Sequence, residues 1–358
     1  MPPYLTQEPP WFTFVVHPRD FEDLWVVPGA ALIDQHSTSE DEFREKMLSL
    51  PPTVIGDVRF GFSPVHGEVV AVMCMPDEIM HLRGRSGIVD AVEVAVGRGT
   101  PVIGLGALTA PATRGGRTLV PLVPRGVTIT TGNAYTAVVA YRNVMEAIGA
   151  LGSSGPVRVA VVGCTGSVGV ATARLLDREG LDLILIGRSE QRVHRELPEL
   201  APKSIVSDSR QDVAGAHIVV LLTGDPTARI EPDVPRPGSI VLDLAHPFNI
   251  PTRRFGEFLA RDIRVAQGGL VDIPGYSSTA QLRLPDGRCT LACLAETYLF
   301  AREGIREHSV GQASVELAIE LEDIADRYGV GPRLLGLAGD NVPSSLGVRS
   351  AAVAAPAH

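Results

Sequence analysis

The sequence predicts an α/β fold with a doubly wound parallel sheet, and three observations carry this prediction. An apolar run at residues 157–162 leads into glycines 163, 166 and 169 and then into helical spacing at 170–176. Further apolar runs alternate with helical patterns, at 181–186, 204–206, 217–222, 239–244 and 263–266. The chain has 358 residues, of which 45% are hydrophobic and 20% charged, which is enough for two sizeable cores. Strands that alternate with helices after a glycine-rich turn are typical of a Rossmann-like sheet.

The glycine-rich turn predicts a phosphate-binding site. The first glycine allows a sharp turn, the second allows backbone N–H groups to approach a pyrophosphate, and the third allows the helix to pack closely on the strand. The N-terminus of the helix adds the positive end of its dipole. The turn residues expected to bind a dinucleotide are Gly163, Thr165, Gly166, Ser167 and Val168.

The end of the second strand indicates which dinucleotide binds. An NAD site carries an acidic residue there, whereas this chain has Gly187, Arg188 and Ser189, with Arg192 one turn later. A guanidinium group suits a 2′-phosphate, so we predict NADPH, bound by Arg188, Ser189 and Arg192. The alternative is that Arg188 is an ordinary surface charge. Further contacts near the nicotinamide are expected at the ends of later strands, from Thr223, Gly268 and Gly269.

We expect four segments along the chain. The first, 1–152, is an α/β substrate-binding domain, with strands at 11–16, 58–62, 67–75 and 102–107 and with helices at 39–48, from Pro76, at 87–98 and at 134–151. Its first helix is capped by Ser37 or Ser39, and residues 113–116 are predicted to form a mobile surface loop. A glycine- and serine-rich joint at 152–156 leads to the NADPH-binding domain, 153–285. C-terminal helices at 286–345 and a flexible tail at 346–358 complete the chain.

Composition excludes several other classes. The net charge of −9 argues against a nucleic-acid surface. Four cysteines at irregular spacing form neither a disulfide ladder nor a paired zinc motif, and we expect no metal site. No stretch has the length of a membrane span, and the first residues do not resemble a signal peptide. The expected location is therefore the cytoplasm.

Residues 130–133, Thr-Thr-Gly-Asn, precede the long helix at 134–151. Thr131 or Asn133 can serve as its N-cap, because both residue types accept hydrogen bonds from free N–H groups. The other interpretation is that the turn faces a substrate carbonyl or the nicotinamide. One residue can do both, so both interpretations stay open.

Cys293 lies in the first turn of a helix predicted at 290–302. The positive end of the helix is expected to lower the pKa of its thiol, and thiolate is the form that attacks acyl carbonyls. Cys289 is a rival nucleophile, and both cysteines can instead be small buried hydrophobic residues. Glu296 is a candidate for orienting a proton relay, or for a capping or surface role. His246, at a strand end before a proline, is a candidate catalytic base or a structural histidine.

Several segments together resemble the long-chain fatty acyl-[acyl-carrier-protein] reductases, which make aldehydes. The most specific are Thr-Thr-Gly-Asn at 130–133 and Ala-Cys-Leu-Ala-Glu at 292–296. The remaining similar segments fall in the same order as in that family, at 65–69, 75–76, 104–109, 136–137, 159–169, 182–185 with Arg188, and 268–271. The similarity covers roughly residues 55–330.

The resemblance implies a ping-pong reduction with Cys293 as the nucleophile. The cysteine would take an acyl group from an acyl-carrier-protein or coenzyme A thioester, and NADPH would reduce the acyl-enzyme to an aldehyde through a thiohemiacetal. Backbone N–H groups or Asn133 would stabilise the oxyanion. A downstream enzyme that uses the aldehyde would be a further partner.

The chain also departs from that family. Its first fifty residues, positions 115–116 and the region beyond 329 differ, and residues 243–246 replace a glycine-rich segment. Two other classes stay open: a dehydrogenase of the shikimate or glutamyl-tRNA reductase kind, and an NADPH-binding protein without catalysis. The shikimate enzyme needs a catalytic Lys-Asp pair, and Lys46 and Lys203 are the only lysines. The glutamyl-tRNA enzyme needs an RNA surface, which the acidic charge disfavours.

Overall fold

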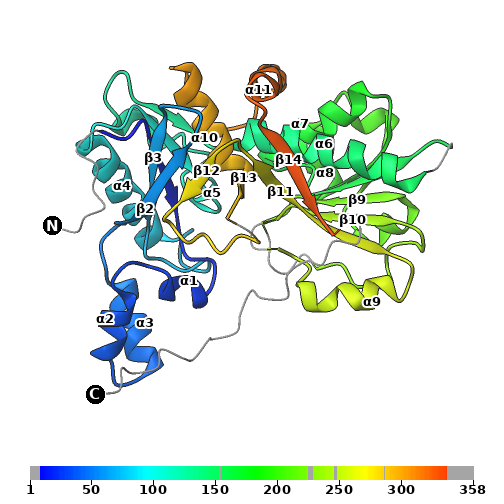
Figure 1. Ribbon diagram of the computed structural model, residues 1–358. Helices are drawn as coiled ribbons and strands as arrows, with labels where there is room; N and C mark the ends of the chain where they lie inside the picture. Colours follow the sequence, from blue (N-terminus) through cyan, green and yellow to red (C-terminus); the bar gives the residue numbers. More distant parts are fainter. Residues whose placement is uncertain (1–8, 153–154, 225–228, 246–247, 286, 337–358) are drawn as a thin grey trace.

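The computed structural model describes residues 9–152, 155–224, 229–245, 248–285 and 287–336, which form two sheets side by side (Figure 1). The larger sheet has eight strands and contains the glycine-rich turn. The smaller sheet has six strands and is built mainly from the N-terminal part of the chain. The molecule is therefore organised around two separate sheets, with helices packed between and around them.

The larger sheet confirms the predicted doubly wound parallel fold. Its six parallel strands are β6 (Arg158–Val162), β7 (Asp182–Ile186), β8 (Ile205–Ser207), β9 (Ile218–Leu221), β10 (Ile240–Asp243) and β11 (Arg264–Asp272). Their spatial order is β8-β7-β6-β9-β10-β11, so the chain starts in the middle and winds outward in both directions. At the far edge, β13 (Cys289–Leu291) and β14 (Gly331–Leu335) both pair antiparallel with β11.

Helices cover both faces of this sheet. One face carries α6 (Asn133–Leu151), α7 (Ser167–Arg178) and α8 (Glu190–Glu196), while the other carries α9 (Phe255–Leu259) and the short η3 (Arg210–Gly215). The strands are therefore buried on both sides, which explains their continuous apolar sequences.

The smaller sheet has the order β12-β2-β3-β1-β4-β5. Strands β1 (Phe12–Val16), β3 (His66–Ala71), β4 (Val102–Leu105) and β5 (Thr128–Thr130) are parallel, while β2 (Thr53–Phe60) is antiparallel to β3. Strand β12 (Tyr276–Ser278) lies within the range predicted for the cofactor domain, yet it pairs with β2. Around this sheet lie α1 (Glu22–Trp25), α2 (Ala30–Gln35), α3 (Glu40–Leu48), α4 (Leu82–Gly97) and α5 (Thr109–Ala112).

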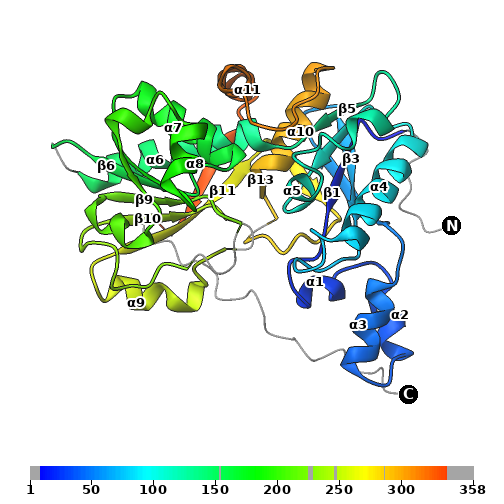
Figure 2. The ribbon, with the colours of Figure 1, turned by 180° about the vertical axis from the view of Figure 1, so that it is seen from behind.

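Two helices near the C-terminal end join the sheets. In both Figures 1 and 2, α10 (Ala292–Glu303) and α11 (Val315–Arg327) lie above the region between the sheets. Two glycines allow α10 to dock. A Cβ at Gly104 would come within 2.0 Å of Thr297, and a Cβ at Gly132 would come within 2.2 Å of the Cβ of Cys293. Among the described residues, no helix is long and apolar enough to cross a membrane.

Several local predictions need correction. Residues 76–80 form a turn, and the helix begins at Leu82, because the chain folds back tightly enough for Gly84 to contact the backbone of Ile79. The strand predicted at 67–75 ends at Ala71. The expected mobile surface loop at 113–116 is packed: Thr113 is buried, and the N–H of Gly311 donates to the carbonyl of Gly115 at 2.7 Å. The predicted cap Ser39 is confirmed, since its hydroxyl accepts from the N–H of Glu42.

Candidate active site

A cavity of about 1180 Å³ lies where the carboxyl ends of the parallel strands of both sheets face each other. Among the residues predicted from sequence, it is lined by Asn133, Gly163, Thr165, Gly166, Ser167, Val168, Arg188, Arg192, Thr223 and Cys293. The structure therefore brings the predicted phosphate turn, the arginines and the candidate nucleophile Cys293 to one site. This is the edge of an open α/β sheet at which ligands bind.

The glycine-rich turn has the geometry that a pyrophosphate requires. Gly163 has a φ of +89°, and a Cβ there would lie 3.1 Å from the backbone of Leu222. A Cβ at Gly169 would lie 2.2 Å from the carbonyl oxygen of Gly163, so only glycine lets α7 start this close to β6. Helix α7 begins at Ser167, directly after the turn, and its first N–H groups are free to bind an anion. These residues fit a dinucleotide.

The hydroxyl of Ser167 has another role. It donates to the carbonyl of Gly311 at 3.0 Å and accepts from the N–H of Ala313 at 2.8 Å. The same 311–313 segment bonds to Gly115 of the smaller-sheet domain. Ser167 therefore ties the glycine-rich turn, through the 311–313 segment, to Gly115, and its hydroxyl is already bonded on both sides.

The arginines follow the second and third strands of the larger sheet. Arg188 and Arg192 line the cavity, and Arg210, which the sequence analysis did not single out, lines it too. The Nε of Arg192 is buried and makes no hydrogen bond, and its ion pair with Glu196 is long at 4.0 Å. Ser189 is the N-cap of α8, accepting from the N–H of Arg192 at 3.2 Å, and it is not among the described residues that line the cavity.

The predicted glycines of β11 have a packing role. A Cβ at Gly268 would lie 2.5 Å from the Oδ1 of Asn143 on α6, and Gly269 has a φ of +74°. They let the strand approach α6 and change its register against β14, and neither is among the described residues that line the cavity. His246 lies outside the described residues, although Leu244 and Ala245 before it line the cavity.

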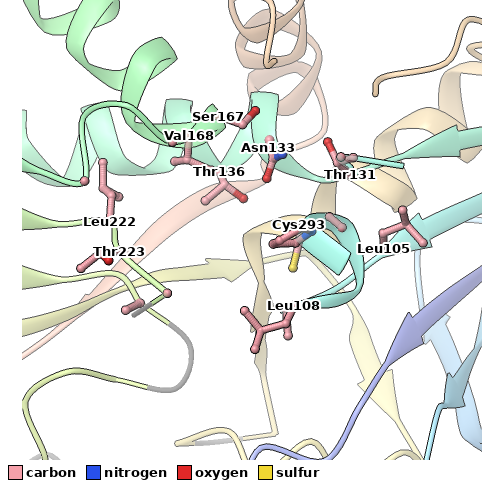
Figure 3. A pocket seen from close by; sticks show the side chains of 18 of the residues that line it. Leu105, Leu108, Thr131, Asn133, Thr136, Ser167, Val168, Leu222, Thr223 and Cys293 are labelled. Atoms are coloured by element: carbon pink, nitrogen blue, oxygen red, sulfur yellow. The ribbon is translucent and has the colours of Figure 1, made fainter. Parts of the chain in front are cut away.

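Cys293 lies in the first turn of α10, and Figure 3 shows its sulfur pointing into the cavity above Leu108. Of the four cysteines, it alone is partly exposed. Its rival Cys289 is fully buried in β13. The structure thus separates two cysteines that the sequence left as alternatives.

The expected lowering of the Cys293 pKa is wrong. Burial raises the pKa of the thiol to about 12, while the backbone N–H groups of Leu294, Ala107 and Cys293 lower it in part. Glu296 raises it further. The helix terminus does act in the predicted direction, but the cost of burying a charged sulfur is larger.

The segments at 130–133 and 292–296, the most specific ones in the sequence, pack against each other. Gly132, with a φ of +73°, is the N-cap of α6 and supplies no side chain, so the capping role expected of Thr131 or Asn133 is wrong. The side chain of Glu296 supplies the capping acceptor for α6 instead. Its fully buried carboxylate accepts from the N–H of Tyr135 at 2.7 Å and from the hydroxyl of Thr130. Burial raises the pKa of this carboxyl, and the hydrogen bonds oppose that effect. Asn133, Thr131 and Thr136 are left to face the cavity near Cys293 (Figure 3).

His17 is a cavity residue that the sequence analysis missed. It follows β1 and is buried, and burial lowers the pKa of its imidazole. Its Nδ1 lies 2.8 Å from the carbonyl of Pro18, and its Nε2 accepts from the N–H of Leu108 at 3.3 Å. A histidine at a strand end before a proline is the same signal that pointed to His246, so the sequence did contain it.

No protein-family model matches the chain. The chain is 26% identical over 323 residues to the long-chain acyl-[acyl-carrier-protein] reductase of Synechococcus elongatus, covering 83% of this chain and 93% of that protein. It is also 28% identical over 255 residues to the aminotransferase PigE of a Serratia strain. That match covers 68% of this chain and only 29% of the length of PigE.

Among solved structures, the shikimate dehydrogenase of Aquifex aeolicus covers 88% of this chain and 98% of its own, at 11% identity and a TM-score of 0.41. The quinate dehydrogenase of Corynebacterium glutamicum, solved with NAD, covers 72% of this chain and 87% of its own, at 13% identity and a TM-score of 0.38.

Proposed function

We propose that the protein is an oxidoreductase that uses NADPH to reduce an acyl thioester to an aldehyde through an acyl group held on Cys293. The observation that carries this proposal is the shared cavity. Its lining includes a partly exposed cysteine at a helix N-terminus, a pyrophosphate-type glycine turn and the arginines that follow β7 and β8. The similarity to a long-chain acyl-[acyl-carrier-protein] reductase over most of both chains supports the same reaction.

In the proposed first step, the Cys293 sulfur attacks the carbonyl carbon of an acyl-carrier-protein or coenzyme A thioester. The new carbon–sulfur bond replaces the bond to the carrier, and the proton of the cysteine thiol passes to the departing carrier sulfur. Thioester exchange is nearly balanced in energy, so the enzyme needs mainly to position the two groups.

The bound cofactor supplies the hydride. Cys293 holds the acyl carbon in place for this transfer, and its sulfur departs as thiolate when the aldehyde forms. One thioester, one NADPH and one proton thereby give one aldehyde, one carrier thiol and one NADP⁺. The glycine turn and the N-terminus of α7 would bind the pyrophosphate of the cofactor. Arg188 and Arg192 would bind its 2′-phosphate.

A shikimate-type dehydrogenase is disfavoured by the lysines. Lys46 pairs with Glu42 and Lys203 with Asp177, and neither lysine is among the cavity residues. A Lys-Asp pair is therefore missing from the described lining of the cavity. Two alternatives remain, an enzyme of the glutamyl-tRNA reductase kind and an NADPH-binding protein without catalysis, and both are separated from the proposal by experiment.

The experiment is intact-mass analysis after incubation with acyl thioesters of graded chain length, without cofactor. We expect one acyl adduct, mapped to the peptide that contains Cys293, and release of aldehyde once NADPH is added. Cys293→Ala should form no adduct and no aldehyde while still binding NADPH, whereas the control Cys289→Ala should keep both. A wild-type protein without an adduct, or aldehyde formation by Cys293→Ala, would contradict the proposal.

A further inference from the structure

The turn at residues 106–108 is held in an unusual conformation beside Cys293. Ala107 has a φ of +50°, which residues other than glycine rarely adopt. The turn is fixed on both sides: the N–H of Gly106 donates to Val15 at 2.8 Å, and the hydroxyl of Thr109 donates to the carbonyl of Gly106 at 2.6 Å. Strained backbone that is held this firmly is often found at functional sites.

This conformation places a backbone donor beside the sulfur. Ala107 and Cys293 both line the cavity, and the N–H groups of Leu294, at the start of α10, and of Ala107 lower the pKa of the Cys293 thiol. The first N–H groups of a helix have no partner within the helix, so those of α10 remain available. Backbone donors from two separate elements therefore lie near the same sulfur.

His17 fixes the other end of the same turn. Its Nε2 accepts from the N–H of Leu108, the residue after Ala107, and its Nδ1 faces the carbonyl of Pro18. The ring can satisfy both only as the neutral tautomer with its proton on Nδ1. Burial in the cavity wall favours the neutral form. In this tautomer the Nε2 of His17 can only accept a hydrogen bond, because the proton of the ring is on Nδ1.

We propose that the N–H of Ala107 and the N-terminal N–H groups of α10 bind the carbonyl oxygen of the acyl group, and that His17 is the positioning residue for this oxyanion site. The oxygen of an acyl group on Cys293 is bonded to the carbon that the sulfur attacks and is two bonds from the sulfur, so donors near the sulfur also lie near that oxygen. When the sulfur attacks, the C=O π electrons move onto this oxygen, and fixed donors stabilise the charge. This inference rests on the proposed function.

The test compares two reactions of the same sulfur. Acylation by an acyl-coenzyme A, without cofactor, builds charge on an oxygen, whereas alkylation by iodoacetamide substitutes at a carbon and needs no oxyanion site. Both rates are measured by intact mass over a range of pH, so that they are compared for equal amounts of thiolate. The variants are His17→Leu, His17→Asn and His17→Gln, with the exposed His36→Leu as a control.

We expect His17→Leu to slow acylation by about 10- to 100-fold relative to alkylation, somewhat less than the loss of a whole oxyanion donor. Asparagine can reach Pro18 but not Leu108, so His17→Asn should behave like leucine. Glutamine can reach Leu108, so His17→Gln should recover most of the rate. If the leucine variant does not fold, the asparagine and glutamine pair decides the question.

Acylation that falls only in parallel with alkylation, or equal acylation by the asparagine and glutamine variants, would overturn this role for His17. The proposed function fails in a different way, namely if the wild-type protein forms no acyl adduct with any thioester. The control His36→Leu should match the wild type in both reactions.

Discussion

At the scale of single residues, the site is defined by what surrounds the sulfur of Cys293. Its position in the first turn of α10 favours a thiolate, but burial raises the pKa of the thiol to about 12. Most of the free protein therefore carries a thiol at neutral pH. The proposed thioester exchange would tolerate this, because the proton that leaves Cys293 would be taken up by the carrier sulfur.

The pH dependence of alkylation follows from this pKa. Below its pKa, the thiolate fraction rises tenfold with each pH unit, so the alkylation rate of Cys293 by iodoacetamide should still be rising at pH 9 to 10, as long as the fold stays intact. Peptide mapping assigns the reaction to Cys293. A rate that levels off near pH 7 would show that the thiol is far more acidic than its burial indicates.

The arginines predict the choice of cofactor. Arg188 lines the cavity after β7, whereas Arg195 lies on α8, is mostly exposed and pairs with Glu196. Loss of one charged hydrogen-bonding group costs roughly 1.5–3 kcal/mol, so Arg188→Ala should weaken NADPH binding by about 10- to 150-fold. NADH binding should change little, and Arg195→Ala should leave both unchanged. Fluorescence titration measures the affinities, and equal losses for both cofactors would remove the 2′-phosphate assignment.

At the scale of elements, the sequence predicted best the unit whose signals are strong and contiguous in the chain. The β6–α7–β7 unit could be predicted because apolar strands and three glycines are contiguous in the chain. The cap of α6 could not, because Glu296 reaches it from 161 positions beyond Tyr135. In the same way, Gly132 reads locally as part of a turn, while its absent side chain makes room for Cys293. The cap of α6 and the need for glycine at position 132 are thus set by contacts with residues far away in the sequence, which local propensity cannot predict.

Glu296 should therefore control the start of α6. Glu296→Ala leaves the buried N–H of Tyr135 and hydroxyl of Thr130 without their acceptor, and we expect a loss of about 2–4 kcal/mol in the free energy of unfolding. Glu296→Gln keeps one acceptor oxygen and should lose clearly less. Urea unfolding followed by circular dichroism measures both, and the exposed Glu316→Ala on α11 is the control. Equal stability of the alanine variant and the wild type would rule out the capping role.

At the scale of the whole molecule, one apolar core spans both sheets. The largest core cluster joins Phe12 and Phe14 of the smaller sheet to Leu175 of α7, Val271 of β11 and Leu299 of α10. The doubly wound order was predictable, but the return of β12 to the smaller sheet was not, because a three-residue strand gives no periodic signal. Since both sheets contribute to this cluster, we expect the described part of the chain to unfold as one unit.

Asp243 should give this global stability a distinctive pH dependence. It is fully buried at the end of β10 and accepts from the N–H groups of Ala245 at 3.2 Å and Ile250 at 2.7 Å. Burial raises the pKa of its carboxyl from 3.8 to about 7, and the hydrogen bonds only partly oppose this. Between these values the folded protein holds a proton that the unfolded chain has released. The contribution of Asp243 is therefore fully present below about pH 4 and is lost as the pH rises toward 7.

Asp243→Asn should remove this dependence, because an amide does not titrate in the range. In the wild type, Asp243 should lower the free energy of unfolding by up to ~1.4 kcal/mol per pH unit between pH 4.5 and 7. The asparagine variant loses one acceptor oxygen, so it should be less stable by about 1–2 kcal/mol at the acidic end but with a flatter profile. Urea unfolding across this range measures the difference in slope, with the exposed Asp182→Asn on β7 as the control. Identical slopes for wild type and Asp243→Asn would mean that the Asp243 carboxyl stays ionised in the folded protein, stabilised by the N–H groups of Ala245 and Ile250.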